Sequence, residues 1–588
     1  MKILEALEPL DNLEKKGIDE REISNALRQL IPENPEEVFI ELKAELIAFD
    51  FAENYRSEKT GWGTYFGPMF VMNNGDGTAT ESPSISLVDA TMIDYWEERA
   101  SDAVNPILKA RYSGLVWDFK HKITGISPSH EIAKIYIRAL IDTAAGDYHR
   151  YPTATFGKLK RALTLAIAIN HEELIRQAKN GIIGYENGHA KDDKPGLWGY
   201  SFDLLVNNKK VNLSNEEEQQ IVGELENKLA RLTATDSSDQ KINPWAAEAA
   251  AERLGNYYRK AGDSENSRRV ILSIGDAFQK ILDEGSAMQV SGWLDHLFKL
   301  YNKFNLKEEA AEILLKIREV GPKAAQELKP VTHEFNLPKD EFEQYIKEMT
   351  DGEKEDILFK IATQYLPNKE EVKKEIFKLR NSAPFVFLIS QQLQDEKGRV
   401  VATVGSLDDD LDGHIVRQVS QNLSFSAPFL RSVIQRAIDA RGLSKDDILK
   451  FIQKSPVVDE NRYPIIERAI NAYFDKDYMV FVHLAIPQIE EAVRNIVEMA
   501  GGNVLKTARG GGYHLRTFDD ILRDDIIKEA LGEDFADYYK MLFTDQRGWN
   551  LRNNVCHGMT RPRNFNNQTS DRVLHALLCL TLLEIKPK

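Results

Sequence analysis

The chain has 588 residues, of which 42% are hydrophobic and 29% are charged, and its formal net charge is −16. These fractions exclude a disordered chain, and the length suggests about four units of ordinary domain size. A strongly acidic protein repels a polyanion, so the charge excludes a protein that coats nucleic acid by bulk electrostatics. Any contact with nucleic acid must therefore be local.

Residues 1–213 are expected to form a mostly helical domain with an irregular insert near residues 58–85. Within the insert, Asn-Gly and Asp-Gly pairs at 74–77 predict turns. Apolar residues recur at intervals of three and four in 130–144 and 158–170, as amphipathic helices require. We find no catalytic constellation in this domain.

The next segment, residues 214–378, has a helical pattern throughout. Two pieces of it match at an offset of 43, where Tyr258, Lys260, Glu265 and Val270 align with Tyr301, Lys303, Glu308 and Ile313. One interpretation is a solenoid-like stack of helical hairpins, in which each hairpin covers the apolar face of its neighbour. The other is an irregular helical domain with a coincidental match.

Residues 379–470 are expected to be a connector with a β-hairpin and helices. The hairpin is predicted over about residues 383–405, where β-branched and aromatic residues flank the turn signal DEKG at 395–398. The acidic run at 408–410 follows it. Three adjacent carboxylates point in different directions on almost any backbone, so we expect a solvated loop there and no metal site.

Residues 471–588 are predicted to form a bundle of about four helices. The first helix contains a kink at Pro487. Thr517 and Asp520 resemble a capping box at the start of a helix that continues to Leu531, and Ser570 is expected to cap the last helix. The fold class is therefore mainly α and multi-domain, with a small β-hairpin element.

The apolar run at 573–585 has about thirteen residues, whereas a membrane span needs roughly 20. We expect a buried helix and no membrane partner. Cys556 and Cys579 are too few for a disulfide framework, and the N-terminus lacks a basic start followed by an apolar run. Both observations favour a reducing cytoplasm.

The stretch GWNLRNNVCHGM near the chain end gathers Arg552, Asn553 and His557 on one short predicted helix. Asn550 is expected to cap its start, and Gly558 is expected to end it. Asn553 and His557 are four residues apart and share a face, and the long side chain of Arg552 can reach them from the adjacent position.

These residue types suit the cleavage of RNA. A histidine near its ordinary pKa of ~6.5 can take a proton from a 2′-hydroxyl or give one to the leaving oxygen. The arginine fork matches phosphate oxygens and can stabilise the charge of the transition state. No metal or cofactor is needed if the 2′-hydroxyl is the nucleophile. Cys556 is expected to be a small core residue, because nothing near it in the sequence marks a nucleophile.

Two nearby segments offer further contacts to RNA. Arg509 and His514 in RGGGYH repeat the R-x4-H spacing, but a glycine run cannot hold a stable helix, so we discount a catalytic pair there. A loop in which Arg509 contacts phosphate and a plain flexible linker both remain open. In TRPRNFNNQ, Arg561 and Arg563 can reach phosphates and Phe565 can stack on an unpaired base, with an ordinary polar loop as the alternative.

The motif resembles that of a known family. NLRNNVCHG is similar to the R-x4-6-H signature of the HEPN superfamily (higher eukaryotes and prokaryotes nucleotide-binding), and especially to the HEPN-like family whose hallmark is RNxxxHG. Four residues match that hallmark, namely Arg552, Asn553, His557 and Gly558. Three residues of the preceding helix resemble its P-x-x-E-x-x-x-R pattern, namely Pro487, Glu490 and Arg494. The resemblance covers about residues 471–588.

The resemblance implies a HEPN-like four-helix bundle that forms a homodimer, so that two Arg/His motifs share one cleft. It also implies a metal-independent endoribonuclease that leaves a cyclic phosphate, of the kind found in toxin and antiphage systems. His557 would be the general acid/base, Arg552 the phosphate ligand and Asn553 a polar helper. Either Glu490 or Glu491 would orient a basic group in support, and the sequence leaves that choice open.

Two functions are compatible with the sequence. The first is an endoribonuclease with an RNA substrate, regulated by residues 1–470 through a protein trigger, in stress or antiphage defence. The second is a non-catalytic helical scaffold whose bundle dimerises or binds a nucleotide or RNA. A scaffold should keep its function after His557→Ala, whereas a nuclease should lose it.

Overall fold

The computed structural model of the protein describes residues 2–34, 38–54, 62–73, 79–234, 242–329, 338–395 and 397–584. Within these ranges the chain is mainly helical, with small two-stranded antiparallel sheets, which confirms the predicted fold class at this level. The chain divides into two compact units. Unit 1 comprises Met1–Gly285 and Leu297–Ala311, and unit 2 comprises Ser286–His296 and Glu312–Lys588. The four predicted domain boundaries stay predictions.

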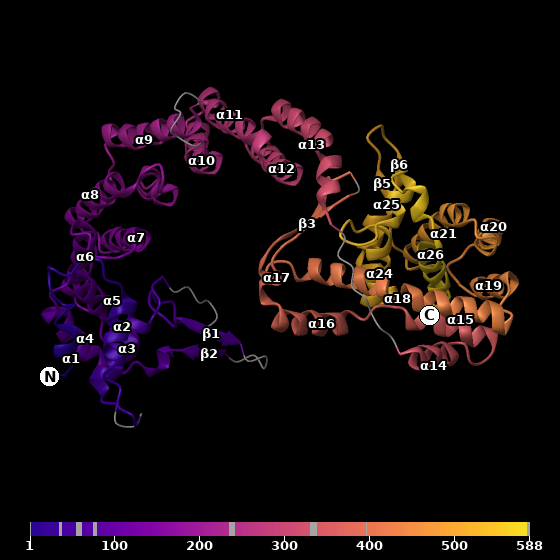
Figure 1. Ribbon diagram of the computed structural model, residues 1–588, viewed down its shortest axis with the longest axis horizontal. Helices are drawn as coiled ribbons and strands as arrows, with labels where there is room; N and C mark the ends of the chain where they lie inside the picture. Colours follow the sequence, from indigo (N-terminus) through magenta and orange to yellow (C-terminus); the bar gives the residue numbers. More distant parts are fainter. Residues whose placement is uncertain are drawn as a thin grey trace. The chain divides into compact units, whose positions relative to one another are not determined.

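Unit 1 consists of helices that pack mainly against their neighbours in the chain (Figure 1). Its elements are α1 (Lys2–Leu7), α2 (Glu20–Arg28), α3 (Ile40–Asp50), β1 (Phe70–Asn73), β2 (Ala79–Ser82), η2 (Ile85–Leu87), α4 (Ala90–Asp102), α5 (Pro106–Thr124), α6 (His130–Ala145), α7 (Pro152–Ala168), α8 (Glu172–His189), η3 (Pro195–Leu197), η4 (Phe202–Val206), α9 (Asn215–Thr233), α10 (Pro244–Lys260), α11 (Ser264–Ile281) and η5 (Leu282–Glu284). Large aromatic side chains fill the core of α4 to α7, including Trp96, Tyr112 and Tyr136.

The insert predicted to be irregular contains a two-stranded sheet. Strands β1 and β2 pair in antiparallel register, with Phe70 opposite Ser82. The turn signals at 74–77 lie outside the described residues. These strands were not predicted, because Phe70–Asn73 is a very short apolar run and such a run alone does not distinguish a strand from a loop.

The sequence match at an offset of 43 corresponds to two successive helix pairs. Helices α10 and α11 form the first pair, and α12 (Ala287–Lys303) and α13 (Lys307–Glu327) form the second. The C-terminal ends of α10 and α12 are 43 residues apart, and so are the first residues of α11 and α13. Val270 and Ile313 occupy equivalent buried positions. Helices α12 and α13 contribute to both units.

Unit 2 has one continuous hydrophobic core that extends from Ile346 to Leu580. Its elements are α14 (Lys339–Met349), α15 (Lys354–Gln364), α16 (Lys369–Ser382), α17 (Pro384–Leu388), β3 (Gln391–Gln394), β4 (Val400–Val404), α18 (Leu411–Arg441), α19 (Lys445–Ile452), η6 (Glu460–Arg462), α20 (Tyr463–Phe474), α21 (Tyr478–Met499), β5 (Leu505–Thr507), β6 (Tyr513–Leu515), α22 (Phe518–Leu522), α23 (Asp525–Leu531), α24 (Glu533–Phe543), α25 (Leu551–Cys556), η7 (Pro562–Asn564), α26 (Asn567–Cys579) and η8 (Leu580–Leu582). Helix α26 packs against α15, α18 and α21.

Local details of unit 2 agree with the sequence in part. The predicted hairpin forms as β3 and β4, and Thr517 forms the predicted capping box with Asp520. Of the acidic run, Asp410 caps α18 by accepting from the backbone N–H of Gly413 (2.8 Å). Every residue from Val573 to Cys579 is buried, as expected of this segment, and Ile585 lies outside the described residues.

Three local predictions for unit 2 are wrong. Residues 384–388 form the short helix α17, because Pro384 occupies its first turn, where a proline favours a helix. The helix predicted to continue to Leu531 is split into α22 and α23, because Asp524 caps a new start. Ser570 does not cap α26; the cap is Asn566, which accepts from the backbone N–H of Thr569 (3.0 Å).

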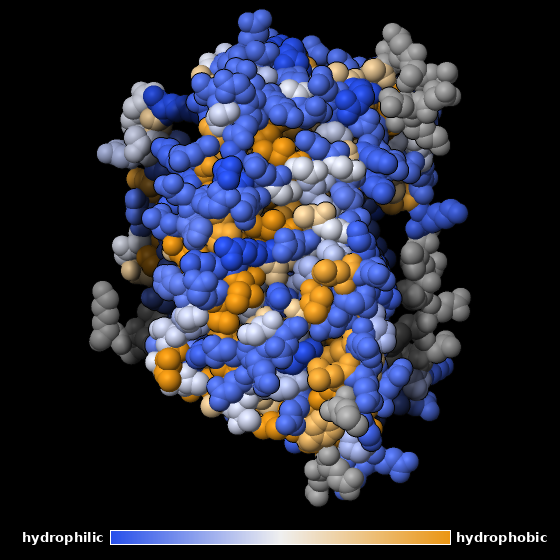
Figure 2. All heavy atoms as spheres, turned by 90° about the vertical axis from the view of Figure 1, so that its left-hand side faces the viewer, coloured by the Kyte–Doolittle hydropathy of each residue, from blue (hydrophilic) through white to orange (hydrophobic). Residues whose placement is uncertain are grey.

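In the described part of the chain, no helix combines the length and apolar character that crossing a bilayer requires. Figure 2 shows the side of the molecule that lies at the left of Figure 1. Apolar side chains reach this surface in several patches, and hydrophilic side chains lie between the patches.

Candidate functional site

The motif lies on α25, a short helix that packs against α21 and α24. Its start differs from the prediction. Asn550 has a left-handed backbone (φ 51°), and its side chain does not cap the helix. Instead, Asn550 Oδ1 accepts from Asn553 Nδ2 (2.8 Å). The end agrees with the prediction, because Gly558 has φ 66° and the N–H of Met559 reaches back to the carbonyl of Asn554 (2.8 Å).

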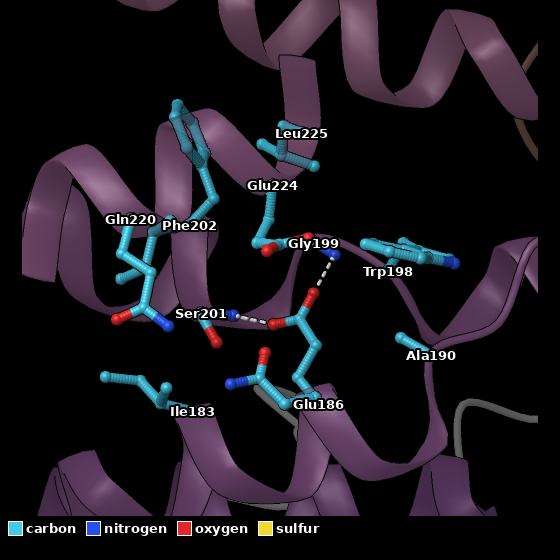
Figure 3. A pocket seen from close by; sticks show the side chains of 12 residues that line it. Ile183, Glu186, Ala190, Trp198, Gly199, Ser201, Phe202, Gln220, Glu224 and Leu225 are labelled. Carbon is cyan, nitrogen blue, oxygen red and sulfur yellow. Dashed lines mark hydrogen bonds between the residues drawn. The ribbon is translucent and has the colours of Figure 1, made fainter. Parts of the chain in front are cut away.

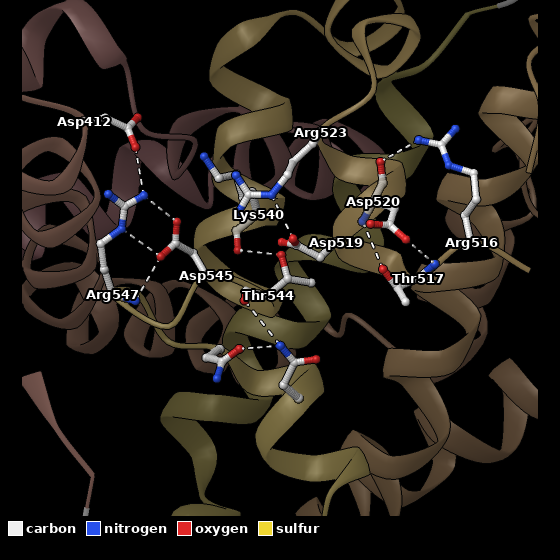
Figure 4. A network of polar contacts seen from close by, with 12 residues as sticks. Asp412, Arg516, Thr517, Asp519, Asp520, Arg523, Lys540, Thr544, Asp545 and Arg547 are labelled. Atoms are coloured by element: carbon white, nitrogen blue, oxygen red, sulfur yellow. Dashed lines mark hydrogen bonds and ion pairs between the residues drawn. The ribbon is translucent and has the colours of Figure 1, made fainter. Parts of the chain in front are cut away.

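A network of ion pairs and hydrogen bonds fixes the segment that leads into α25 (Figure 4). Arg547 binds Asp545 (2.9 Å) and Asp412 (2.8 Å), which joins the segment to the start of α18. Burial alone would raise the pKa of Asp545, but the hydrogen bonds from Arg547 lower it. Gly548 is required, because a Cβ there would lie 2.3 Å from the carbonyl oxygen of Met541.

Glu490 of α21 holds the guanidinium of Arg552. Arg552 Nε donates to Glu490 Oε2 (2.9 Å), and Nη2 lies 3.4 Å from Oε1. Arg552 Nη1 lies 3.4 Å from Asn553 Oδ1. The side chain of Arg552 is 24% exposed, and a guanidinium has more N–H donors than these contacts use. Arg552 is thus held in place and keeps donors for a ligand.

The two candidate glutamates have different partners. Glu490 also accepts from Arg494 Nη2 (3.0 Å), so it lies between two arginines. Glu491 pairs with Arg494 and, at 3.5 Å, with Arg462. The geometry therefore favours Glu490 as the residue that positions Arg552, whereas Glu491 holds Arg494. Arg494 itself is buried, and its Nε has no partner among the described residues.

Asn553 and His557 have different surroundings. Asn553 Nδ2 donates to the carbonyl of Thr544 (3.3 Å) and to Asn550, so its amide ties α25 to the preceding segment. His557 follows the last residue of α25 and is exposed. Its imidazole makes no hydrogen bond or ion pair with the described residues. It is therefore accessible to a substrate, and no carboxylate among the described residues fixes its tautomer.

The predicted RNA-binding residues around the motif are only partly brought together. Arg561 precedes η7, Arg563 lies within it, and both are exposed. Phe565 is half-buried and stacks against His483 of α21, with ring centroids 5.1 Å apart. His483 was not among the residues predicted from the sequence. The signal was present, since His483 lies four and seven residues before Pro487 and Glu490, which places all three on one helix face.

The glycine-rich segment RGGGYH is not a plain linker, and the loop in which Arg509 lies is the turn of a hairpin. It forms the turn and second strand of the hairpin β5–β6, in which Lys506 is opposite His514. Gly511 and Gly512 both have φ 81°, which allows the tight turn. Arg509 lies at the exposed tip of this hairpin. The strands are attached to unit 2 by Lys506–Asp520 (3.0 Å) and Arg516–Asp524 (2.6 Å).

Cys556 is exposed, which corrects the expectation of a core residue. At the end of a helix of only six residues, it points away from the core side that Leu551 and Val555 occupy. Partial burial of the thiol raises its pKa; Arg552 lowers it and Glu490 raises it. The thiol thus lies within the electrostatic range of the Arg552–Glu490 pair.

Comparisons with protein-family models, curated proteins and solved structures find no match for this chain.

Proposed function

We propose that the C-terminal segment of unit 2 is a metal-independent endoribonuclease of the HEPN type. One observation carries the proposal: Arg552 and the exposed His557 lie on one short helix, and Glu490 holds the guanidinium while leaving donors for a phosphate. Glu490 is one of the two glutamates that the motif suggests as support for a basic group, and it is the one that contacts Arg552. The core of α21, α24 and α26 around the motif supports a HEPN-like bundle.

The proposed reaction uses groups of this chain and of the RNA. The imidazole of one His557 takes the proton of a 2′-hydroxyl, and the 2′-oxygen attacks the adjacent phosphorus. The bond to the 5′-oxygen breaks, and that oxygen leaves with a proton from an imidazolium. The products are a 2′,3′-cyclic phosphate and a 5′-hydroxyl. Arg552 donates to the non-bridging oxygens as their charge increases.

This reaction needs a base and an acid, and we propose that His557 of two copies supplies them in a homodimer. The exposure of His557 supports this arrangement, because the second imidazole can approach only from outside the chain. Residues 1–470, including the solenoid-like helix pairs α10–α11 and α12–α13, would hold the nuclease in check until a protein trigger binds. We place this activity in the cytoplasm, in stress or antiphage defence.

The test is incubation of the purified full chain with mixed cellular RNA in EDTA, followed by chemical typing of the new ends. We expect cleavage by the wild type with cyclic phosphate ends, and none by His557→Ala or Arg552→Ala. His514→Ala is the matched control, because His514 has the same spacing from an arginine in the hairpin. It should cleave like the wild type. Ends without cyclic phosphate would contradict the proposed reaction.

The non-catalytic scaffold is the second candidate, and the Arg552–Glu490 pair also favours it, because that pair can serve structure alone. A locked nuclease and a scaffold would both fail to cleave RNA in vitro. Overexpression separates them. Growth arrest that disappears with His557→Ala identifies a locked nuclease, whereas unchanged growth with both proteins identifies a scaffold.

A further inference from the structure

A cavity of about 170 Å³ lies in unit 1 between α8, the segment that leads into η4, and α9 (Figure 3). Its apolar walls are Ile183, Ala190, Phe202, Ile221 and Leu225, together with the ring of Trp198. A small molecule with a short hydrocarbon chain would replace water against these walls, which is favourable.

The polar residues of the cavity are acidic or neutral. Glu186 is buried, and its carboxylate accepts from the backbone N–H groups of Gly199 (2.5 Å) and Ser201 (2.6 Å). These bonds fix the carboxylate and leave further lone pairs for a ligand. Glu224 of α9 adds a second carboxylate (Figure 3). None of the described residues that line the cavity is a lysine or an arginine.

A buried lysine lies beside the cavity and contacts its aromatic wall. Lys228 is fully buried, and its Nζ lies 4.2 Å from the ring centroid of Trp198. Nζ has no hydrogen-bond partner among the described residues. The nearby carboxylate of Asp192 already binds Arg231 (2.8 Å). Trp198 therefore contacts an amine of the protein and also forms a wall of the acidic cavity.

We propose that this cavity binds a small organic cation, a primary amine with a short apolar chain, whose ammonium group pairs with Glu186 and Glu224 beside Trp198. The two carboxylates supply the charge complement, and the aromatic ring supplies a cation–π contact. This site lies in unit 1 and is independent of the proposed nuclease.

An anionic ligand fits this cavity less well than a cationic one. A carboxylate in the cavity would approach Glu186 and Glu224, which repel it. The nearest cations are Lys228 and Arg253; neither lines the cavity, and Arg253 already pairs with Asp203 (2.7 Å). Binding of an anion in preference to a cation would therefore overturn the proposal.

Lys228 makes the expected affinity depend on pH. Burial lowers the pKa of Lys228 to about 7. A protonated Lys228 repels a cationic ligand, so affinity should increase as pH rises from about 6 to 8 and this amine loses its proton. Lys228→Met should bind the amine with an affinity that no longer changes over this range.

The experiment uses the full chain and three probes of similar size: n-butylammonium, 1-butanol and butyrate. Binding is measured by calorimetry at pH 8. We expect n-butylammonium to bind with a dissociation constant below about 10 mM and the other two probes to bind more weakly. Butyrate binding more tightly, equal binding of all three probes, or no binding of n-butylammonium would each overturn the proposal.

Two matched variants of α9 test whether the ammonium group of the ligand contacts Glu224. Glu224→Gln should weaken n-butylammonium about fivefold or more, because it removes one carboxylate but little volume. Glu216→Gln is the control, because Glu216 is exposed in the first turn of the same helix and does not line the cavity. Equal weakening by both variants would show a general charge effect and would overturn the assigned site. Circular dichroism checks that each variant is folded.

Discussion

Two segments of unit 2 have the same R-x4-H spacing but form different structures. Arg552 and His557 lie on and just after α25, and Glu490 of α21 holds the guanidinium. Arg509 and His514 lie on the hairpin β5–β6, with Arg509 at the exposed tip. The difference shows that spacing along the chain does not make a site. A partner from a distant element is needed to hold the arginine in a defined position.

The two segments also differ in how their charges are used. At α25, Glu490 lies between Arg552 and Arg494 with little exposure, so the charge pairs are partly protected from solvent. At the hairpin, Lys506 and Asp520 are both about half exposed, and their pair attaches a strand to the unit. Protected pairs contribute more to positioning than exposed pairs, which solvent screens.

The largest expected difference between the segments is catalytic. Arg552→Lys keeps the charge but loses the planar fork that can contact Glu490 and a phosphate together. We expect RNA cleavage to fall about 100-fold, the effect of losing one well-placed donor to a developing charge. Arg509→Lys, the matched change at the hairpin, should leave the cleavage rate unchanged. Equal losses in the two variants would mean that the fork geometry at α25 is not special.

The second difference concerns stability. Glu490→Gln removes the carboxylate between Arg552 and Arg494, and among the described residues the buried Arg494 then keeps Glu491 as its charged partner. We expect the free energy of unfolding of unit 2 to fall by about 1–3 kcal/mol. Asp520→Asn at the hairpin should cost about 0.5 kcal/mol or less. Urea unfolding followed by circular dichroism measures both. A larger loss from Asp520→Asn would reverse the comparison.

The reactivity of the Cys556 thiol depends on the charges of Arg552 and Glu490. We expect the effect of these charges on its alkylation rate to be smaller than the two effects above. Glu490 raises the pKa of this exposed thiol, and Arg552 lowers it. Glu490→Gln should therefore increase the rate of alkylation by iodoacetamide at pH 8, and Arg552→Gln should decrease it, each about two- to threefold. Cys579 is buried and should not be alkylated in the folded protein. Changes in the same direction would show that the thiol responds to local unfolding and not to charge.

The features of the C-terminal part of unit 2 that the sequence predicted correctly are local ones. A helix end at Gly558 and a capping box at Thr517 follow from residues within one turn, so the structure matches the pattern there. The sequence did not predict the left-handed backbone of Asn550, because asparagine is also a preferred N-cap residue with an extended backbone. Ser570 and Asn566 are both good caps, and packing of α26 decides between them.

The partners of the candidate residues could not be predicted, because they come from distant segments. Glu490 and Glu491 are equivalent in the sequence, and only the packing of α25 on α21 brings Glu490 to Arg552. The sequence pattern does mark Lys228 as an unusual residue. It occupies a position of the apolar stripe of α9 that includes Ile221 and Leu225, where a lysine is unusual.

The smallest expected effect is the pH dependence of the hairpin. Hydrogen bonds from Lys506 and Thr517 lower the pKa of Asp520 to about 2. Because this value lies below that of an unfolded aspartate, the attachment is complete above about pH 4 and is lost as pH falls through about 2. The pair is exposed, so the loss should be only a few tenths of a kcal/mol. Hydrogen exchange of residues 505–515, corrected for intrinsic rates, should therefore increase slightly between about pH 4 and 2. Asp520→Asn should show the faster exchange already at pH 4, and a hairpin that exchanges equally in both proteins would mean that the pair does not attach it.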